Sequence, residues 1–213
     1  MKILRPVAGF LPTYGYFSNY CDSFEGRILD YGSNCGNLLK SGPLNPANYT
    51  GVDVDEFALY VGKVRFPKAQ WLHHNRWHPC YNPDGDDSFV DLPEVDLAFS
   101  YSVFSHFWFE EFIHTLQRIK AKQIYLSYCD IKNSKCVEWF REQLTDPEEI
   151  PTDEKFIYLV DNYVSREVPN KCAKFTSFWN TEYLVHLLGR FGKVEAFPPP
   201  ERWYQSCIRI NTA

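Results

Sequence analysis

The sequence contains no long apolar run. Its opening stretch, MKILRPVAGFLPTYGYF, is interrupted by Pro6 and Pro12, and no other stretch approaches the ~18 apolar residues that a membrane-spanning helix needs. We therefore expect neither membrane insertion nor a cleaved targeting segment.

The sequence also lacks closely spaced cysteine pairs. Its seven cysteines are odd in number, are spread along the chain and form no CxxC motif. This spacing does not suit a disulfide framework, so we expect reduced thiols and a cytoplasmic protein. The seven are Cys21, Cys35, Cys80, Cys129, Cys136, Cys172 and Cys207.

An excess of basic charge is absent as well. Lys and Arg together number 22 against 27 Asp and Glu, which gives a formal net charge of -5. This balance disfavours a broad phosphate-binding face, and hence nucleic acid as a partner, although it is compatible with a small local basic patch.

Apolar and aromatic residues are plentiful. Of the 213 residues, 45% are hydrophobic and 17% aromatic, which excludes a disordered chain or a coiled coil. At ~100–200 residues per domain, the length predicts a single domain over residues 1–213. An aromatic N-terminal arm (1–25) and a proline-broken insertion or lid (145–174) account for the excess length.

Short apolar runs alternate with amphipathic stretches along the chain. This alternation is typical of a parallel sheet that is covered by helices on both faces. The predicted strands are 27–31, 49–54, 69–73, 95–100, 123–128, 193–197 and 205–210. The predicted helices are 57–64, 109–120, 136–144 and 181–191, together with one that begins at Asn37.

The first strand runs into a glycine-containing turn, Asp30-Tyr31-Gly32-Ser33-Asn34-Cys35-Gly36. The glycines stand four residues apart and do not match the GxGxxG pattern with which dinucleotide folds approach a pyrophosphate. A bound diphosphate is therefore disfavoured. Small residues still allow a ligand to approach the backbone, and asparagine at position 34 tolerates a left-handed conformation.

Asp53 ends the second strand, about 20 residues after the glycine turn, where a carboxylate accepts hydrogen bonds from ribose hydroxyls. In an open parallel sheet, ligands bind at the carboxyl ends of the strands. The two loops together predict a ligand that contains a nucleoside but no bound diphosphate.

At these positions the sequence resembles the class I S-adenosylmethionine (SAM)-dependent methyltransferases. Asp30, Gly32 and Gly36 match the family's acid-x-Gly-x-Gly-x-Gly motif, with Asn34 at the middle glycine, and Asp53 matches its ribose-binding acid. The stretch 95–106, VDLAFSYSVFSH, is similar to the family's fourth-strand segment. The resemblance covers residues 26–130 well. It implies a three-layer Rossmann-like α/β sandwich with a mostly parallel seven-stranded sheet and helices on both faces.

The resemblance also implies roles for individual residues. Gly32, Ser33, Asn34 and Gly36 form the loop beside the methionine part of the cofactor, and Asp30 faces its ammonium group. Asp53 holds the ribose, and Val54 packs on the adenine. Asn75 or Arg76 lies at the amino edge of the adenine, where the family often has an acid instead. Ser100 and Tyr101 close the pocket beside the sulfonium.

The residues around the acceptor admit two interpretations. His106 follows the fourth strand and titrates near neutrality, so it is a candidate general base, but it could equally cap the following helix. Aromatic side chains could form a substrate lid or simply cover a face of the sheet. The candidate substrate-binding residues are Tyr14, Tyr16, Phe17, Trp108 and Trp179.

One histidine-rich cluster invites a metal interpretation. His74, His78 and Cys80 are suitable zinc ligands, but the chain has no second ligand pair at a familiar spacing, and a polar loop explains the residues equally well. Asp84-Gly85-Asp86-Asp87 lacks the spacing of a calcium loop, so we interpret it as a solvated turn. We predict no metal.

These features predict a SAM-dependent methyltransferase that modifies an O or N atom of a small molecule. Two alternatives stay open. One is methylation of a nucleic acid or protein side chain, with a basic rim formed by Lys171, Lys174, Arg190, Lys193 and Arg202. The other is a catalytically silent chain that binds the cofactor as a partner subunit. The sequence leaves the oligomeric state open.

Overall fold

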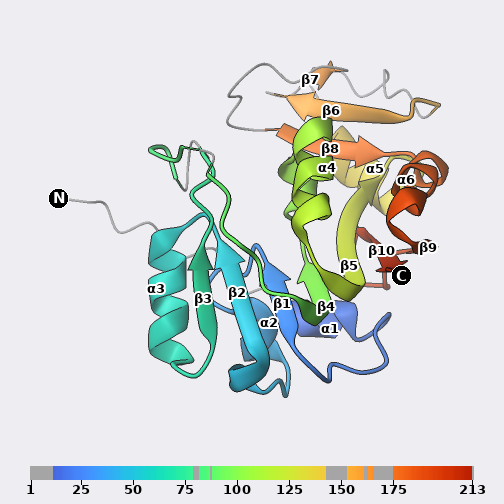
Figure 1. The fold of residues 1–213 in the computed structure, drawn as a ribbon. Helices are drawn as coiled ribbons and strands as arrows, with labels where there is room; N and C mark the ends of the chain where they lie inside the picture. The colour runs from blue at the N-terminus through green and yellow to red at the C-terminus, as the bar shows by residue number, and fades with distance from the viewer. Residues whose placement is uncertain are drawn as a thin grey trace. The chain divides into compact units, whose positions relative to one another are not determined.

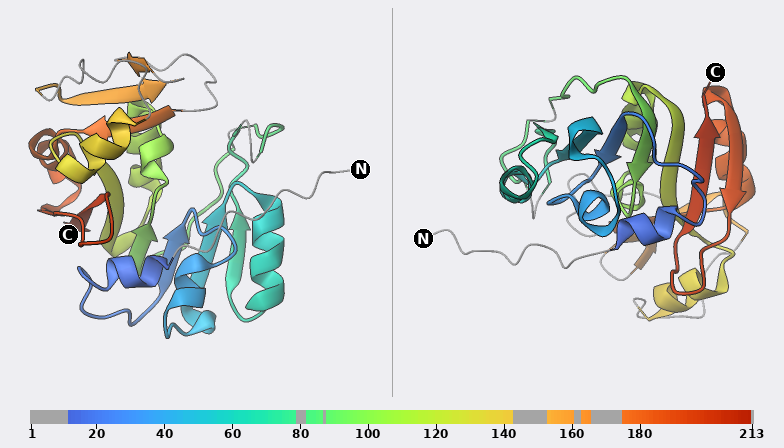
Figure 2. Two further views of the ribbon diagram at one scale, coloured as in Figure 1. Left: turned by 180° about the vertical axis from the view of Figure 1, so that it is seen from behind. Right: turned by 90° about the horizontal axis from the view of Figure 1, so that it is seen from below.

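A computed structural model of the chain describes residues 12–78, 82–86, 88–142, 153–160, 163–165 and 175–212. These residues form two compact units. The first unit extends to Asp91, and the second begins at Leu92. Figures 1 and 2 show the helices and strands of each unit.

The first unit contains three parallel strands. Strand β1 (Ile28–Tyr31) pairs with β2 (Tyr49–Asp53), which pairs in turn with β3 (Gln70–His73), so the carboxyl ends of all three lie at one edge. Helix α3 (Glu56–Arg65) lies against β2 and β3 (Figures 1 and 2). The unit also contains α1 (Thr13–Phe17), α2 (Asn37–Ser41) and the 3-10 helix η1 (Pro46–Asn48).

Three glycines allow Trp71 of β3 to pack tightly in this unit. A Cβ atom at Gly36, Gly51 or Gly62 would lie 2.9, 2.6 or 2.5 Å from the indole ring. These glycines belong to the turn after β1, to β2 and to α3, so a single side chain ties the glycine turn, the sheet and the helix together.

The second unit is built around β5 (Ala121–Asp130), which pairs with parallel β4 (Val95–Ser100) and with antiparallel β10 (Ser206–Asn211). Strand β9 (Lys193–Phe197) pairs with β10. Its helices are α4 (Phe109–Arg118), α5 (Ser134–Arg141) and α6 (Thr181–Leu188), with η2 (Phe104–His106) and η3 (Gly189–Phe191). All seven predicted strands and the predicted helices are therefore present, and most of them have shifted ends.

Strand β5 is longer than predicted, and its last residues change partner. Cys129 and Asp130 pair with parallel β8 (Phe175–Trp179), which pairs with antiparallel β6 (Phe156–Val160). Strand β7 (Tyr163–Ser165) pairs with β6. The predicted pattern contains none of these three strands.

Part of the predicted insertion or lid at 145–174 belongs to the hydrophobic core. Within β6, Ile157 is fully buried and packs in one cluster with Cys129, Ile131 and Phe178. The flanking prolines and mixed charge hide this strand in the sequence. Most of the remaining segment lies outside the described residues, and its role as a lid stays a prediction.

Five cysteines can be placed, and all five are buried as free thiols. Cys80 and Cys172 lie outside the described residues. Across the part of the chain that the structure describes, every helix is too short or too polar to cross a membrane.

Candidate functional site

The turn after β1 has an alternating backbone conformation. Gly32, Asn34 and Gly36 all have positive φ angles, of 80°, 50° and 86°. Asparagine is one of the few residues with a side chain that adopts this left-handed conformation readily. Asn34 thus adopts a backbone conformation that few residues other than glycine adopt.

Hydrogen bonds fasten this turn to the carboxyl end of β2. The backbone N–H groups of Gly32 and Ser33 both donate to the carbonyl of Val52, at 2.8 and 2.9 Å. The N–H of Asn34 donates to Oδ2 of Asp53 at 2.7 Å, and its side-chain oxygen accepts from the N–H of Cys35 at 2.7 Å. The first two predicted ligand loops therefore lie in direct contact.

Asp53 is the acidic centre of this edge. Its second oxygen accepts a hydrogen bond from the N–H of Asp55 at 3.0 Å, and the side chain is half-buried. Desolvation raises the pKa of the Asp53 carboxyl, and the N–H groups of Asp55 and Asn34 oppose the rise. A carboxylate has about four acceptor sites, so two further hydrogen bonds are available on a side chain that reaches solvent.

Asp30 is buried behind the turn. Its Oδ2 accepts a hydrogen bond of 2.6 Å from the hydroxyl of Tyr49 on the neighbouring strand. Desolvation raises the pKa of Asp30 to about 7, the Tyr49 hydroxyl lowers it in part, and the charge of Asp53 raises it further. Near neutral pH this carboxyl can hold or release a proton.

The loop after β3 contains Asn75 and Arg76, the residues predicted beside an adenine. The Asn75 amide is used within the loop, because it donates to Asp86 at 2.8 Å and accepts from Asn82 at 3.0 Å. Asn82 also donates to the carbonyl of Arg76 at 2.9 Å. These bonds give Asn75 a role in shaping the loop, and its contact with a ligand stays a prediction.

Val54 and the histidines of β3 complete this edge of the first unit. Val54 is half-buried, and its carbonyl lies 3.1 Å from Nε2 of His73. His74 is buried, and its Nδ1 lies 2.6 Å from the hydroxyl of Tyr31. Among the described residues no group of three or more potential ligands could hold a metal ion, and Cys80 lies outside them.

In the second unit, Ser100 and Tyr101 stand at the carboxyl end of β4. Ser100 is buried, whereas Tyr101 is half-buried and packs against Trp203 with the two ring planes at 74°. The next residue, Ser102, has a positive φ of 56°. Its N–H donates to the hydroxyl of Ser127 at 2.7 Å, which donates to Gln205 at 2.5 Å.

The remaining candidates of the second unit have different environments. His106 ends η2 and is exposed. Trp108 is half-buried, but Trp179 is 1% exposed and its ring packs at a tilt against those of buried Phe112 and half-buried Phe156. Burial of this kind favours a packing role for Trp179.

The aromatic residues of the N-terminal arm also differ in burial. Tyr16 and Phe17 of α1 are 0% and 1% exposed, so they serve the core. Tyr14 is half-buried and packs against Phe24 and Gly42. Of the two open interpretations of the arm, the burial of Tyr16 and Phe17 favours the covering role.

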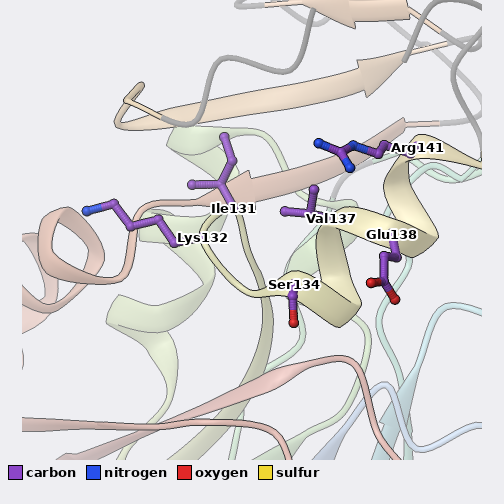
Figure 3. A pocket seen from close by; sticks show the side chains of 6 residues that line it. All are labelled: Ile131, Lys132, Ser134, Val137, Glu138 and Arg141. Atoms are coloured by element: carbon purple, nitrogen blue, oxygen red, sulfur yellow. The ribbon is translucent and has the colours of Figure 1, made fainter. Parts of the chain in front are cut away.

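A pocket in the second unit contains none of the predicted site residues. It lies at the end of β5 and along α5, where Ile131 and Val137 stand between the charged groups of Lys132 and Arg141 (Figure 3). Its lining residues are Ile131, Lys132, Ser134, Val137, Glu138 and Arg141.

Comparison with known proteins identifies the fold. No protein-family model matches the chain, and a search of curated proteins finds no match. A SAM-dependent methyltransferase of Thermotoga maritima, described as a possible histamine N-methyltransferase, is 14% identical, with 96% of this chain and 89% of that chain covered and a TM-score of 0.54. The glycopeptide N-methyltransferase MtfA, in complex with S-adenosylhomocysteine (SAH), is 10% identical, with 95% and 89% covered and a TM-score of 0.54.

The chain has the class I SAM-dependent methyltransferase fold. The PH0226 protein of Pyrococcus horikoshii OT3 is a further match, at 14% identity over 92% of this chain and 86% of that chain, with a TM-score of 0.56. These likenesses confirm the predicted Rossmann-like fold class. At such low identity they establish the methyltransferase fold, and they leave the reaction to be argued from the residues.

Sequence reasoning missed Trp203 and Gln205, which contact Tyr101 and Ser127 from the segment before β10. The only sequence signal was the triple proline 198–200, which marks a stiff connection. The contacts of the segment that follows depend on strand pairing, which no local pattern specifies.

Proposed function

We propose that the chain is a SAM-dependent methyltransferase that transfers a methyl group to an O or N atom of a small-molecule acceptor. The observation that carries this proposal is the turn after β1, with positive φ at positions 32, 34 and 36 and a direct hydrogen bond from Asn34 to Asp53. It joins the two motifs that the methyltransferase fold uses for its cofactor.

The residues of this edge fit the cofactor. Asp53 has acceptor sites for two ribose hydroxyls, because backbone N–H groups use only about half of its capacity. Val54 offers half-buried apolar surface to an adenine. We also assign Asp30 to the ammonium group, although its carboxyl is buried and already accepts a hydrogen bond from Tyr49; a nearby cation would favour its ionised form.

The cofactor supplies an activated methyl group on its sulfonium, so the protein has mainly to align the acceptor and exclude water. Such positioning can contribute ~7–11 kcal/mol to lowering a barrier. Ser100 and Tyr101 are the residues we assign to the methyl end of the site. His106 is exposed and is our candidate to take a proton from a hydroxyl or ammonium acceptor.

Calorimetric titration with SAM and SAH tests this proposal. We expect each to bind the folded protein at one site, and Asp53→Ala to weaken binding at least ~10-fold through loss of the ribose hydrogen bonds. Asp55→Ala is the matched control, because it removes the cap of α3 without removing the ribose ligand. Folded wild-type protein that takes up neither compound would contradict the proposal.

Charge and one structural neighbour support a small-molecule acceptor. The net charge of -5 disfavours polyanionic acceptors. The magnesium protoporphyrin IX methyltransferase of Synechocystis, a small-molecule enzyme by its name, shares the fold at 12% identity. The match covers 86% of this chain and 72% of that chain, with a TM-score of 0.50. A protein that binds SAH but methylates no member of a broad panel of small hydroxyl and amino compounds would instead favour the silent cofactor-binding alternative.

A further inference from the structure

Three residues of the second unit form a closed ring of hydrogen bonds through their side chains and one backbone N–H group. The N–H of Ser102 donates to Oγ of Ser127 at 2.7 Å, and the Ser127 hydroxyl donates to Oε1 of Gln205 at 2.5 Å. The Gln205 amide donates back to Oγ of Ser102 at 3.1 Å. Ser127 and Gln205 are 0% and 1% exposed, so solvent cannot replace a lost partner.

The ring stabilises an unfavourable backbone conformation. Ser102 has a φ of 56°, in the left-handed region that a serine adopts only rarely. Because the ring holds both the N–H and the hydroxyl of Ser102, it fixes the direction in which the chain leaves β4. It therefore also sets the position of the preceding residue, Tyr101.

Tyr101 meets a segment that is itself held in place. Its ring packs on Trp203 with centroids 5.2 Å apart and planes at 74°. The N–H of Trp203 donates to the carbonyl of Pro200 at 2.9 Å, and Lys135 of α5 donates to the carbonyl of Glu201. Both Tyr101 and Trp203 are half-buried residues.

We propose that Tyr101 and Trp203 form a preorganised aromatic corner that selects a planar aromatic methyl acceptor, and that Gln205 is the positioning residue that holds this corner through Ser102. The inference rests on the proposed function, which assigns Tyr101 to the methyl end of the site. Two ring surfaces nearly at right angles allow a flat ring to stack on one and meet the edge of the other. A saturated ring of the same size gains neither contact.

The probes are 2-naphthol and its saturated counterpart trans-decahydro-2-naphthol, titrated into the full chain with SAH present. We expect 2-naphthol to bind roughly tenfold more tightly. Trp203→Leu should abolish this preference, and Trp203→Phe should retain most of it because a ring is kept. Equal binding of both alcohols to the wild-type protein, or an unchanged preference in Trp203→Leu, would overturn the proposal.

Gln205→Leu tests the positioning role, with Gln123→Leu as its matched control. Gln123 also makes two side-chain hydrogen bonds, to Tyr125 and Asn211, but at the opposite end of the β5–β10 pair. Both variants should lose stability. Only Gln205→Leu should weaken 2-naphthol binding, by about fivefold to tenfold.

A second variant keeps the test decisive if Gln205→Leu does not fold. Gln205→Glu retains the acceptor for Ser127 and removes the donor to Ser102, so we expect an intermediate loss of 2-naphthol binding. Equal effects of the Gln205 and Gln123 substitutions on the probe would refute the positioning role. Failure of SAH to bind the wild-type protein would instead count against the proposed function. The two failures can be distinguished, because the preference for 2-naphthol can also be measured without SAH.

Discussion

At the scale of single residues, Asp30 links the stability of the protein to pH. Its pKa is raised from 3.8 to about 7, mainly by desolvation, so the folded state holds a proton that the unfolded chain releases at lower pH. Proton binding by Asp30 therefore stabilises the folded state fully below pH ~4. This stabilisation falls as pH rises and is lost above pH ~7. The buried carboxyl thus disfavours folding most strongly at alkaline pH.

We predict that Asp30→Asn reverses this loss. The free energy of unfolding of Asp30→Asn minus that of the wild-type protein should rise by on the order of a few kcal/mol between pH 4 and pH 8. The reason is that the amide cannot ionise. Urea unfolding at several pH values measures the difference. Asp86→Asn is the control. The pKa of the exposed Asp86 is lowered by its hydrogen bonds with Ser88, so this variant should not show the rise expected for Asp30→Asn. A flat difference for Asp30→Asn across this range would refute the prediction.

Single residues also show where prediction from sequence works. The left-handed Asn34 and the ribose-site acid Asp53 were identified because backbone conformation and strand ends leave local marks in a sequence. The sequence left open whether Tyr16, Phe17 and Trp179 are buried, because an aromatic side chain suits a core and a pocket equally well. Only the packed structure distinguishes the two.

At the scale of elements, the contact between α3 and β3 depends on the absence of a side chain at Gly62. A Cβ atom at Gly62 would lie 2.5 Å from the indole ring of Trp71. Gly36 and Gly51 also lie close to this ring. We predict that Gly62→Ala destabilises the protein by about 1–3 kcal/mol through overpacking, despite the better helix propensity of alanine.

Gly15 of α1 provides the matched helical control. Nothing lies within 4 Å of a Cβ atom at this position, so Gly15→Ala should be neutral or stabilise the protein by up to ~1 kcal/mol. Chemical unfolding of both variants measures the difference. Equal stability of Gly62→Ala and Gly15→Ala would show that Trp71 moves aside without cost.

Elements differ in how far their sequence specifies them. Strands β4 and β9 were predicted with their observed bounds, because each is a short apolar run between clear turn signals. Strands β6 and β8 were missed, although Ile157 and Phe178 are core residues, because β6 lies in a stretch with prolines and mixed charge and β8 follows it directly. Their pairing with each other and with the end of β5 is a long-range property.

At the scale of the whole molecule, charge discriminates between the proposed small-molecule acceptor and a nucleic acid. Contacts with phosphates release counterions, so nucleic-acid binding by such contacts weakens steeply with salt. The chain has a net charge of -5. In the basic rim that the nucleic-acid alternative requires, Lys193 forms an ion pair with Glu195 at 2.9 Å. The carboxylate of Glu195 thus offsets the charge of Lys193, one of the three rim cations that the structure describes.

We predict that the full chain does not retain a ~20-nucleotide single-stranded RNA in a gel-shift experiment at ~50 mM salt, with or without SAH. The substitution Glu195→Gln is the matched variant, since it removes the partner of Lys193 and of Arg209 and raises the net charge by one. It should leave RNA retention absent, because a single added charge cannot offset the acidic balance of the whole surface. A wild-type complex that forms at ~50 mM salt and is lost by ~200 mM would instead support a nucleic-acid acceptor, since that loss is the signature of phosphate contacts.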